Sequence, residues 1–386
     1  MARLLIKNIG KMVSGDIRNP LIDADALLVE DGKIARIGKG EELEVSAEKV
    51  IDAKGITLTP GLIDSHFHPV LGDFTPRQSQ FGFIESALHG GVTTMISAGE
   101  VHLPGRPRDV AGTKALAILA AKSWANLRPG GVKVLGGGLI LEKGLKEKDF
   151  EELAAEGVTH VGEIGLGSVN QPEEAAPMVR WAKKNGMTVM MHTGGTSIPG
   201  STTVTAEEVI ATAPDVIAHL NGGPTAVFPE EVDKLIKKTP LAFEIVHCGN
   251  PKIALQIIKT AKEAGAFHRI LIGNDAPSGT GVIPLGILRV LNLICSLGRV
   301  KAEEAIAMAT GNTARIYKLN RGIIREGLEA DLVLMDAPMG SVGEDALQAI
   351  EAGDIPGISF VIIDGQLRIT ASRNTPPPKQ KAIVEA

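Results

Sequence analysis

Aromatic side chains are scarce in this chain of 386 residues: phenylalanine, tryptophan and tyrosine together make up 3% of it. Basic residues are not in excess either, because the formal net charge is -5. Proteins that bind nucleic acid depend on a positively charged surface and often on aromatic rings that stack on the bases. The composition therefore argues against a nucleic-acid partner.

Disulfides and long hydrophobic runs are missing as well. The two cysteines, Cys248 and Cys295, cannot form a disulfide framework, and no apolar run approaches the roughly 20 residues that cross a bilayer. The first ten residues lack the apolar segment and the small-residue cleavage site of a signal peptide. From these absences we expect a cytoplasmic protein without a membrane partner.

Between about residues 58 and 300, short apolar runs alternate with amphipathic stretches of helix length. Eight runs recur at intervals of roughly 25 to 40 residues, the size of a βα unit. The helices expected between them include 109–127 and 173–185. The pattern predicts a (β/α)8 TIM barrel of the α/β class, although an open doubly wound sheet would give a similar pattern. The runs end near His68, Ala98, Gly138, Glu163, His192, His219, Val246 and Asp275.

The two ends of the chain predict β-hairpins. Asp31-Gly32 and Asp364-Gly365 each lie between strand-like runs, and such dipeptides favour a two-residue turn. Neither end has enough strands for a core of its own, so we expect both to pair into one small β-sandwich domain beside the barrel. The domains expected are a composite β-domain (1–58 plus 321–372), a metal-dependent hydrolase barrel (59–320) and an exposed C-terminal tail (373–386).

The strongest local pattern is a His-x-His pair at the end of residues 60–68, PGLIDSHFH. Side chains two residues apart on a strand point to the same face, so His66 and His68 could share a metal ion. Such a pair is common by chance, and two polar residues that cap a strand would look the same. The pair by itself leaves both interpretations open.

Further candidate ligands end later runs of the same region. His192 and His219 follow the fifth and sixth runs, and Glu163 and Asp275 end the fourth and the eighth. Active sites of TIM barrels form at the C-terminal ends of the strands. Four imidazoles and two carboxylates exceed the needs of one tetrahedral ion, so two metal ions are expected. A solvated strand end could explain each residue alone, but chance is a poor explanation for all of them in this order.

This order of residues resembles the amidohydrolase superfamily, and the resemblance covers nearly the whole chain. It implies a binuclear centre held by the six residues named above. Many members have a carboxylated lysine after the fourth strand, whereas this chain has Glu163, whose carboxylate would bridge the metals. Imidazole and carboxylate ligands accept Zn, Fe, Mn or Co. The resemblance implies Zn and/or Fe as the metals, and it also implies a homotetramer.

Four longer stretches resemble superfamily members that hydrolyse a cyclic amide in nicotinate degradation. They are ALHGGVTTMI (87–96), MHTGGTSIPG (191–200), NGGPT (221–225) and GNDAPSGTG (273–281). The resemblance implies that 6-oxo-1,4,5,6-tetrahydronicotinate is hydrolysed to 2-formylglutarate and ammonia. In this hypothesis a metal-bridging hydroxide attacks the amide, and Asp275 shuttles the proton as general base and then acid.

Two alternatives remain open for the function. Another cyclic amidohydrolase, acting on an imide, a hydantoin or an imidazolone, would use the same metal ligands. A metal-free protein that kept the barrel, lost catalysis and serves in interactions is the other alternative.

A substrate derived from nicotinate carries a carboxylate, which needs hydrogen-bond donors. The backbone amides of Gly194, Gly195 and Thr196, with the Thr196 hydroxyl, could form an anion-binding loop, but the glycines could equally serve a tight turn. His102 and His247 follow the second and seventh runs, and either could reach the substrate. The other candidate substrate-binding residues are Arg77, Asn250 and Thr280. A surface ion pair is the structural alternative for Arg77, and a turn or helix start before Pro251 is the alternative for Asn250.

Overall fold

The computed structural model describes residues 3–43, 47–71, 80–196, 202–222, 226–277 and 283–385. Eight parallel strands lie in two runs of neighbours, and parallel bridges from Phe67 to Ala276 and from Leu139 to Val161 join these runs into a closed ring. The predicted TIM barrel is confirmed, and closure excludes the open sheet. Its strands are β8 (Leu62–Phe67), β9 (Val92–Ser97), β10 (Lys133–Leu135), β11 (His160–Ile164), β12 (Thr188–Met191), β13 (Val216–Ile217), β14 (Ala242–Val246) and β15 (Ile270–Gly273).

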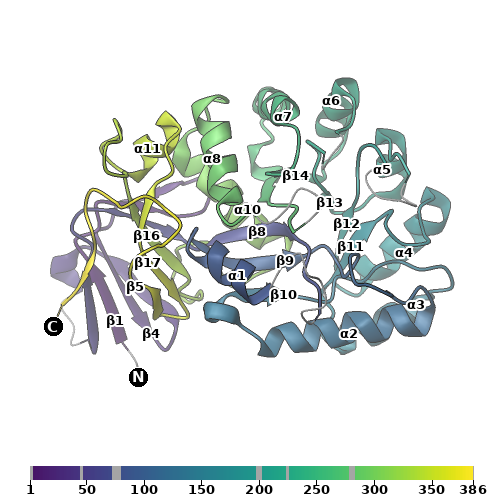
Figure 1. Ribbon diagram of the computed structural model, residues 1–386, viewed down its shortest axis with the longest axis horizontal. Helices are drawn as coiled ribbons and strands as arrows, with labels where there is room; N and C mark the ends of the chain where they lie inside the picture. The colour runs from purple at the N-terminus through teal and green to yellow at the C-terminus, as the bar shows by residue number, and fades with distance from the viewer. Residues whose placement is uncertain are drawn as a thin grey trace.

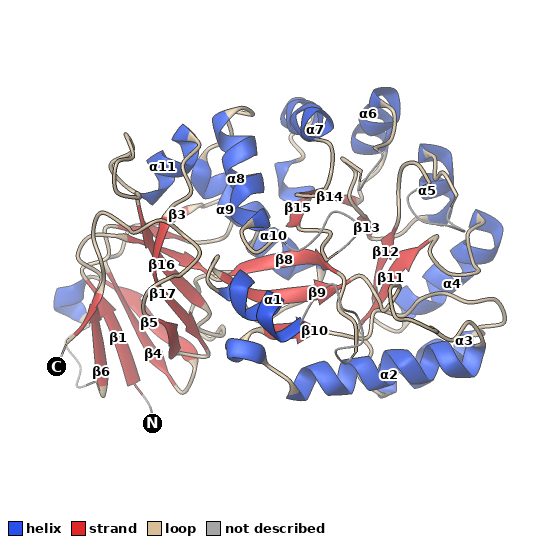
Figure 2. Ribbon diagram, in the orientation of Figure 1, coloured by secondary structure: helices blue, strands red, loops and turns tan. Residues whose placement is uncertain are grey.

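Helices cover the outside of this barrel (Figures 1 and 2). The predicted helices 109–127 and 173–185 match α2 and α4 closely, because Asp109 caps α2 and Gly186 follows α4 with a φ of 77°. No helix in the described part of the chain is both long and apolar enough to cross a membrane. The helices are α1 (Gln80–Leu88), α2 (Val110–Asn126), α3 (Glu147–Ala155), α4 (Pro172–Lys184), α5 (Ala206–Thr212), α6 (Pro229–Lys238), α7 (Pro251–Glu263), α8 (Gly286–Ser296), α9 (Ala302–Met308), α10 (Gly311–Ile316) and α11 (Ala346–Ala352).

The barrel strands are apolar along their length because both of their faces are buried. Ile63 packs with Met190 and Leu271 in one hydrophobic cluster. Its neighbour Leu62 belongs to a different cluster, together with helix residues such as Ile84. Successive side chains of a strand point to opposite faces, so the strands separate an inner core from the core beneath the helices.

Strands from both ends of the chain form two further sheets, and Figure 1 shows the purple and yellow strands side by side. One sheet has the order β19-β6-β1-β4-β5 and the other β18-β17-β16-β7-β2-β3. Pairing of β7 with β16 joins the two ends. The strands are β1 (Arg3–Lys7), β2 (Lys11–Val13), β3 (Leu21–Ile22), β4 (Ala26–Glu30), β5 (Lys33–Gly38), β6 (Lys49–Asp52), β7 (Thr57–Pro60), β16 (Leu332–Asp336), β17 (Gly357–Ile363), β18 (Gln366–Ile369) and β19 (Ile383–Val384).

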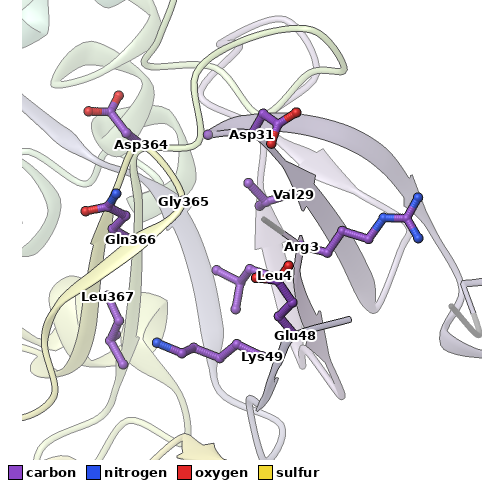
Figure 3. Close-up of a pocket in the computed structure, with 11 residues that line it drawn as sticks. Arg3, Leu4, Val29, Asp31, Glu48, Lys49, Asp364, Gly365, Gln366 and Leu367 are labelled. Atoms are coloured by element: carbon purple, nitrogen blue, oxygen red, sulfur yellow. The ribbon is translucent and has the colours of Figure 1, made fainter. Parts of the chain in front are cut away.

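The two predicted hairpin turns are present and touch each other. Asp31 and Gly32 have φ angles of 47° and 81°, and Asp364 and Gly365 have 52° and 69°, as the favoured two-residue turn requires. A Cβ atom on Gly32 would lie 3.0 Å from the carbonyl oxygen of Asp364. Figure 3 shows both aspartates beside an open groove of about 720 Å³, which none of the candidate metal ligands lines.

The end of the chain makes some contacts with the terminal sheets. Most of its side chains are exposed, but Ile383 and Val384 pair with β6, and Pro378 bridges to Pro338. Without β19, strand β6 would lie at the edge of its sheet with unpaired backbone groups. The terminal residues cover that edge.

A cluster of charged residues connects the barrel to the terminal sheets. The ammonium group of Lys133, on β10, lies 2.6 Å from Oε2 of Glu329, 2.8 Å from Oδ2 of Asp331 and 2.6 Å from Oδ1 of Asp364. The three carboxylates are close enough to bind a metal, but the Lys133 ammonium already supplies a cation among them.

We expect Lys133→Met to lower the free energy of unfolding by about 3 kcal/mol, because it removes the closest cation from the buried carboxylate of Asp331. Asp331 would keep only a contact of 3.7 Å with Arg321. Lys122→Met is the matched control, since its partner Glu156 is half exposed and such surface pairs contribute about 0–1 kcal/mol. Urea unfolding of both variants measures the difference. Equal losses would contradict a structural role for the cluster.

Candidate metal centre

Glu163 lies at the centre of the predicted ligand set, on β11. Its Oε1 atom is 2.7 Å from Nε2 of His219 and 3.3 Å from Nδ1 of His192. Its Oε2 atom is 3.5 Å from Nε2 of His66 and 3.7 Å from Nε2 of His68. The two oxygens of one carboxylate therefore face two pairs of imidazoles, as a ligand that bridges two metal ions must do.

Two groups of buried side chains share Glu163. In each group the potential ligand atoms all lie within 4.8 Å of one another. Imidazole nitrogen and carboxylate oxygen are ligands for divalent Zn, Fe, Mn and Co, so these residues fit two such ions. The groups are His66 with His68 and Glu163, and Glu163 with His192 and His219.

Asp275 joins the set two residues after the end of β15. Its Oδ1 atom lies 2.9 Å from Nε2 of His68 and 3.7 Å from Nε2 of His66. Asp275 and His219 have positive φ angles of 55° and 31°. Such backbone conformations cost about 1–3 kcal/mol and are concentrated at functional sites. The structure thus brings all six predicted side chains together.

These groups hold opposite charges in close contact. Burial alone would raise the pKa of Glu163, but the facing His66 and His219 outweigh it and hold that pKa well below 4.5. Burial would lower the pKa of His66, yet Glu163 and Glu244 raise it well above 6.5. Burial would raise the pKa of Asp275, but the hydrogen bond with His68 and the charges of the neighbouring histidines together lower it below 3.8. The site therefore favours positive charge beside two ionised carboxylates, and metal cations supply such charge.

Two buried carboxylates support the ligands, and the sequence-based prediction gave a role to neither. Glu244, on β14, accepts hydrogen bonds from Nδ1 of His66 at 2.8 Å and from the backbone N–H of His219 at 3.2 Å. Asp64, on β8, accepts from the backbone N–H groups of His66 at 3.2 Å and Asn274 at 2.9 Å. The sequence could have indicated such roles, because an acidic residue inside an otherwise apolar strand is buried and needs a hydrogen-bond partner.

The loop after β12 departs from the predicted anion-binding site at its first residue. The backbone N–H of Gly194 donates to the carbonyl of Val204 at 3.3 Å, within a short antiparallel bridge. This amide therefore has a partner within the fold, which does not support its predicted role in anion binding. Gly195 is half-buried and Thr196 is exposed, and their contact with a substrate stays a prediction.

Asn250 caps a helix. Its Oδ1 atom accepts from the backbone N–H groups of Lys252 at 2.9 Å and Ile253 at 3.2 Å, and Pro251 begins α7. Asparagine before a first-turn proline is a favoured helix start. Asn250 is therefore a helix-start residue, as the structural alternative predicted, and its contacts do not support the substrate-binding role.

His102 and His247 both follow barrel strands at the end that carries the candidate ligands. The ring of His102 packs edge-on against the ring of His68, with the centroids 4.8 Å apart. His247 is half-buried, and burial lowers its pKa below 6.5. The remaining predicted substrate-binding residues, Arg77 and Thr280, lie outside the described residues.

Glu100 is a buried carboxyl group that follows β9. Its Oε2 atom accepts the backbone N–H of Leu71 at 3.0 Å, and 2% of the residue is exposed. Burial raises the pKa of Glu100 to about 8, and the bond from Leu71 offsets this only in part. The folded chain therefore keeps a proton at pH 7 that the unfolded chain releases.

We expect Glu100→Gln to gain stability relative to the wild type as the pH rises from about 5 to 8. Between the ordinary pKa of 4.5 and the folded value of about 8, the folded wild type binds more protons, so its stability falls as the pH rises. A shift of one pKa unit corresponds to about 1.4 kcal/mol, so the difference in stability between Glu100→Gln and the wild type should change by about 4 kcal/mol over this pH range. Chemical unfolding at several pH values measures it, and a gap independent of pH would contradict the assignment.

The sequence matches a known protein family and individual relatives over most of its length. The model of the amidohydrolase family matches residues 57–368. The chain is 60% identical to the enamidase of Eubacterium barkeri over 384 residues, which cover 99% of each chain. It is 25% identical to the imidazolonepropionase of Geobacillus sp. (strain WCH70), covering 88% of this chain and 92% of that one.

Solved structures give the same result for the fold. A crystal structure of enamidase matches with a TM-score of 0.97 and 59% sequence identity, covering 100% of both chains. A β-aspartyl dipeptidase from Fervidobacterium islandicum AW-1 matches with a TM-score of 0.70 at 21% identity, covering 98% of this chain and 100% of that one. At this lower identity the similarity concerns the fold alone.

Proposed function

Because the chain belongs to the amidohydrolase family and hydrolyses amide C–N bonds, we propose that it opens the cyclic amide 6-oxo-1,4,5,6-tetrahydronicotinate in nicotinate degradation. The products are 2-formylglutarate and ammonia. The observation that carries the proposal is the contact of Glu163 with two imidazole pairs. The similarity to enamidase, which extends over nearly the whole chain, supports the substrate.

The family typically has a binuclear metal centre, and the side chains of this site would hold it. When bound, two divalent ions lower the pKa of a water molecule and draw charge from the amide carbonyl. We propose Zn and/or Fe, with Mn or Co as alternatives. The proposed ligands are His66, His68 and Asp275 on one side, His192 and His219 on the other, and Glu163 between them.

Asp275 is the proposed catalytic residue. Its carboxylate accepts a proton from the attacking water as the new C–O bond forms at the amide carbon. It then gives this proton to the ring nitrogen as the C–N bond breaks. The hydrogen bond with His68, which lowers the pKa of Asp275, keeps this carboxylate ionised at neutral pH and ready to act as a base.

Ring opening leaves an enamine that carries the former ring nitrogen. Its imine tautomer reacts with a second water to give an aldehyde and ammonia, so each substrate consumes two waters. The carboxylate of the substrate needs donors during both stages. We propose the backbone amides of Gly195 and Thr196 and the Thr196 hydroxyl, with Arg77 and Thr280 as further candidates.

A panel of cyclic amides tests the substrate. We expect kcat/KM for 6-oxo-1,4,5,6-tetrahydronicotinate to exceed that for an imide, a hydantoin and an imidazolone. Loss of the ring carboxylate should raise KM more than it lowers kcat, because that group binds and does not react. A preference for one of the other ring systems would support another cyclic amidohydrolase on the same ligands.

The assembly and the domain boundaries are also proposals. We propose a cytoplasmic homotetramer in which the terminal sheets form a β-sandwich domain, with the barrel over residues 59–320. A hydrophobic cluster that contains Ile6 and Leu27 from one end and Leu334 and Ile362 from the other supports the sandwich. Neither Cys248 nor Cys295 forms a disulfide, which is consistent with a reducing compartment. Light scattering of the purified protein tests the tetramer.

A further inference from the structure

Glu244 contacts ligands of both metal positions although it belongs to neither ligand group. It lies on β14, and none of its surface is exposed. Its Oε2 atom accepts hydrogen bonds from Nδ1 of His66 at 2.8 Å and from the backbone N–H of His219 at 3.2 Å. Its Oε1 atom accepts the hydroxyl of Ser65 at 2.8 Å. One side chain thus connects β8 to the turn after β13, and each of these segments carries a candidate ligand.

The bond to His66 decides which ring nitrogen is available to a metal. Because Glu244 accepts a hydrogen bond from Nδ1 of His66, a neutral His66 carries its hydrogen on Nδ1 and has an unprotonated Nε2. That Nε2 atom lies 3.5 Å from Oε2 of Glu163 and 3.7 Å from Oδ1 of Asp275. A carboxylate behind a metal-binding histidine fixes the ring and raises the basicity of its free nitrogen.

The bond to His219 acts on the other position through the backbone. His219 has a φ of 31°, which is unfavourable for a residue with a Cβ atom. Glu244 satisfies the buried N–H of His219 in this conformation. From there Nε2 of the ring lies 2.7 Å from Oε1 of Glu163. The same carboxylate therefore supports a side chain in one ligand group and a main chain in the other.

We propose that Glu244 is a positioning residue of the metal centre, which fixes the ring of His66 in one half and the backbone of His219 in the other. The inference rests on the proposed two-metal function. It predicts that loss of Glu244 weakens both metal positions together. A residue that supported a single ligand would weaken only one of them.

Three variants separate the contributions of Glu244. Glu244→Leu removes both acceptor oxygens at similar volume. Glu244→Gln keeps one oxygen that can accept from His66 and His219, but it removes the charge. Ser65→Ala is the matched control, because it removes a hydrogen bond to Glu244 and leaves the contacts with both ligands.

Competition of metal-loaded protein with a chelator measures the affinity at each position. We expect Glu244→Leu to lower the affinity at both positions by about 10–100-fold, as loss of a carboxylate behind a metal ligand does elsewhere. Glu244→Gln should fall between Glu244→Leu and the wild type, and Ser65→Ala should stay within about twofold of the wild type. The visible absorption of the Co(II)-loaded protein should change in Glu244→Leu and not in Ser65→Ala.

Wild-type affinity in Glu244→Leu, or a loss confined to one position, would overturn the proposal. If Glu244→Leu does not fold, Glu244→Gln decides, since an affinity equal to that of Ser65→Ala would overturn it. These readouts do not depend on turnover. A wild type that binds two metals without releasing ammonia would refute the proposed substrate alone, whereas a wild type that binds no metal would overturn both proposals.

Discussion

Replacing Asp275 by asparagine is expected to lower kcat by about 10³-fold and to leave the metal content close to that of the wild type. The asparagine amide cannot take a proton from the attacking water or return it to the ring nitrogen. Its carbonyl oxygen can still occupy the place of Oδ1, which lies 2.9 Å from Nε2 of His68. KM should change little, because the lost interaction belongs to the transition state. Steady-state kinetics together with elemental analysis measure both quantities.

The matched control for this variant is Asp336→Asn. Asp336 is a buried carboxylate of β16 whose Oδ2 atom accepts the backbone N–H of Gln380 at 2.9 Å. The chemical change is the same but lies in the terminal sheets, so kcat should stay within about twofold of the wild type. An Asp275→Asn protein with both metals bound and kcat within tenfold of the wild type would refute the proton-transfer role.

Replacing Glu163 by glutamine is expected to weaken both metal positions and to remove activity with them. Glu163 is shared by the two ligand groups, and each of its oxygens faces a different imidazole pair. A glutamine amide has one oxygen, and its NH₂ group cannot bind a cation, so the bridge is lost. Since Glu163 contacts both pairs directly, we expect the loss of affinity to exceed the roughly 100-fold that outer residues contribute.

The control for Glu163→Gln is Glu142→Gln. Glu142 is also fully buried, but it pairs with Arg106 at 2.9 Å and lies in neither ligand group of the barrel. That variant should lose stability, because the buried Arg106 loses the negative charge of its partner, and it should keep two metals per chain. Retention of both metals at wild-type affinity in Glu163→Gln would contradict the bridging role.

The six candidate ligands could be predicted because each follows or ends an apolar run. In a parallel barrel the C-terminal ends of the strands meet at one face, so the order along the chain implies proximity in space. The turns at Asp31-Gly32 and Asp364-Gly365 were equally predictable, since few residue pairs tolerate two positive φ angles. The contact between these turns could not be predicted, because it depends on how the two sheets pack.

Other features of the site could not be predicted from the sequence. A lone acidic residue within a strand, such as Glu244, gives no indication of its partners, and these come from β8 and the turn after β13. The side chain of an asparagine suits both a substrate contact and a helix cap, so the sequence could not decide between them for Asn250. The structure shows that Asn250 caps α7. The amide of Gly194 is used by Val204, ten residues along the chain, in a bridge that no local pattern predicts.

The most direct test of the account is ammonia release from 6-oxo-1,4,5,6-tetrahydronicotinate by metal-free protein to which Zn(II) or Fe(II) is added stepwise. The rate should rise with added metal and level off at two ions per chain, as the two ligand groups imply. Each substrate should yield one ammonia and one aldehyde. A rate independent of added metal, or no ammonia from protein that holds two ions per chain, would contradict the account.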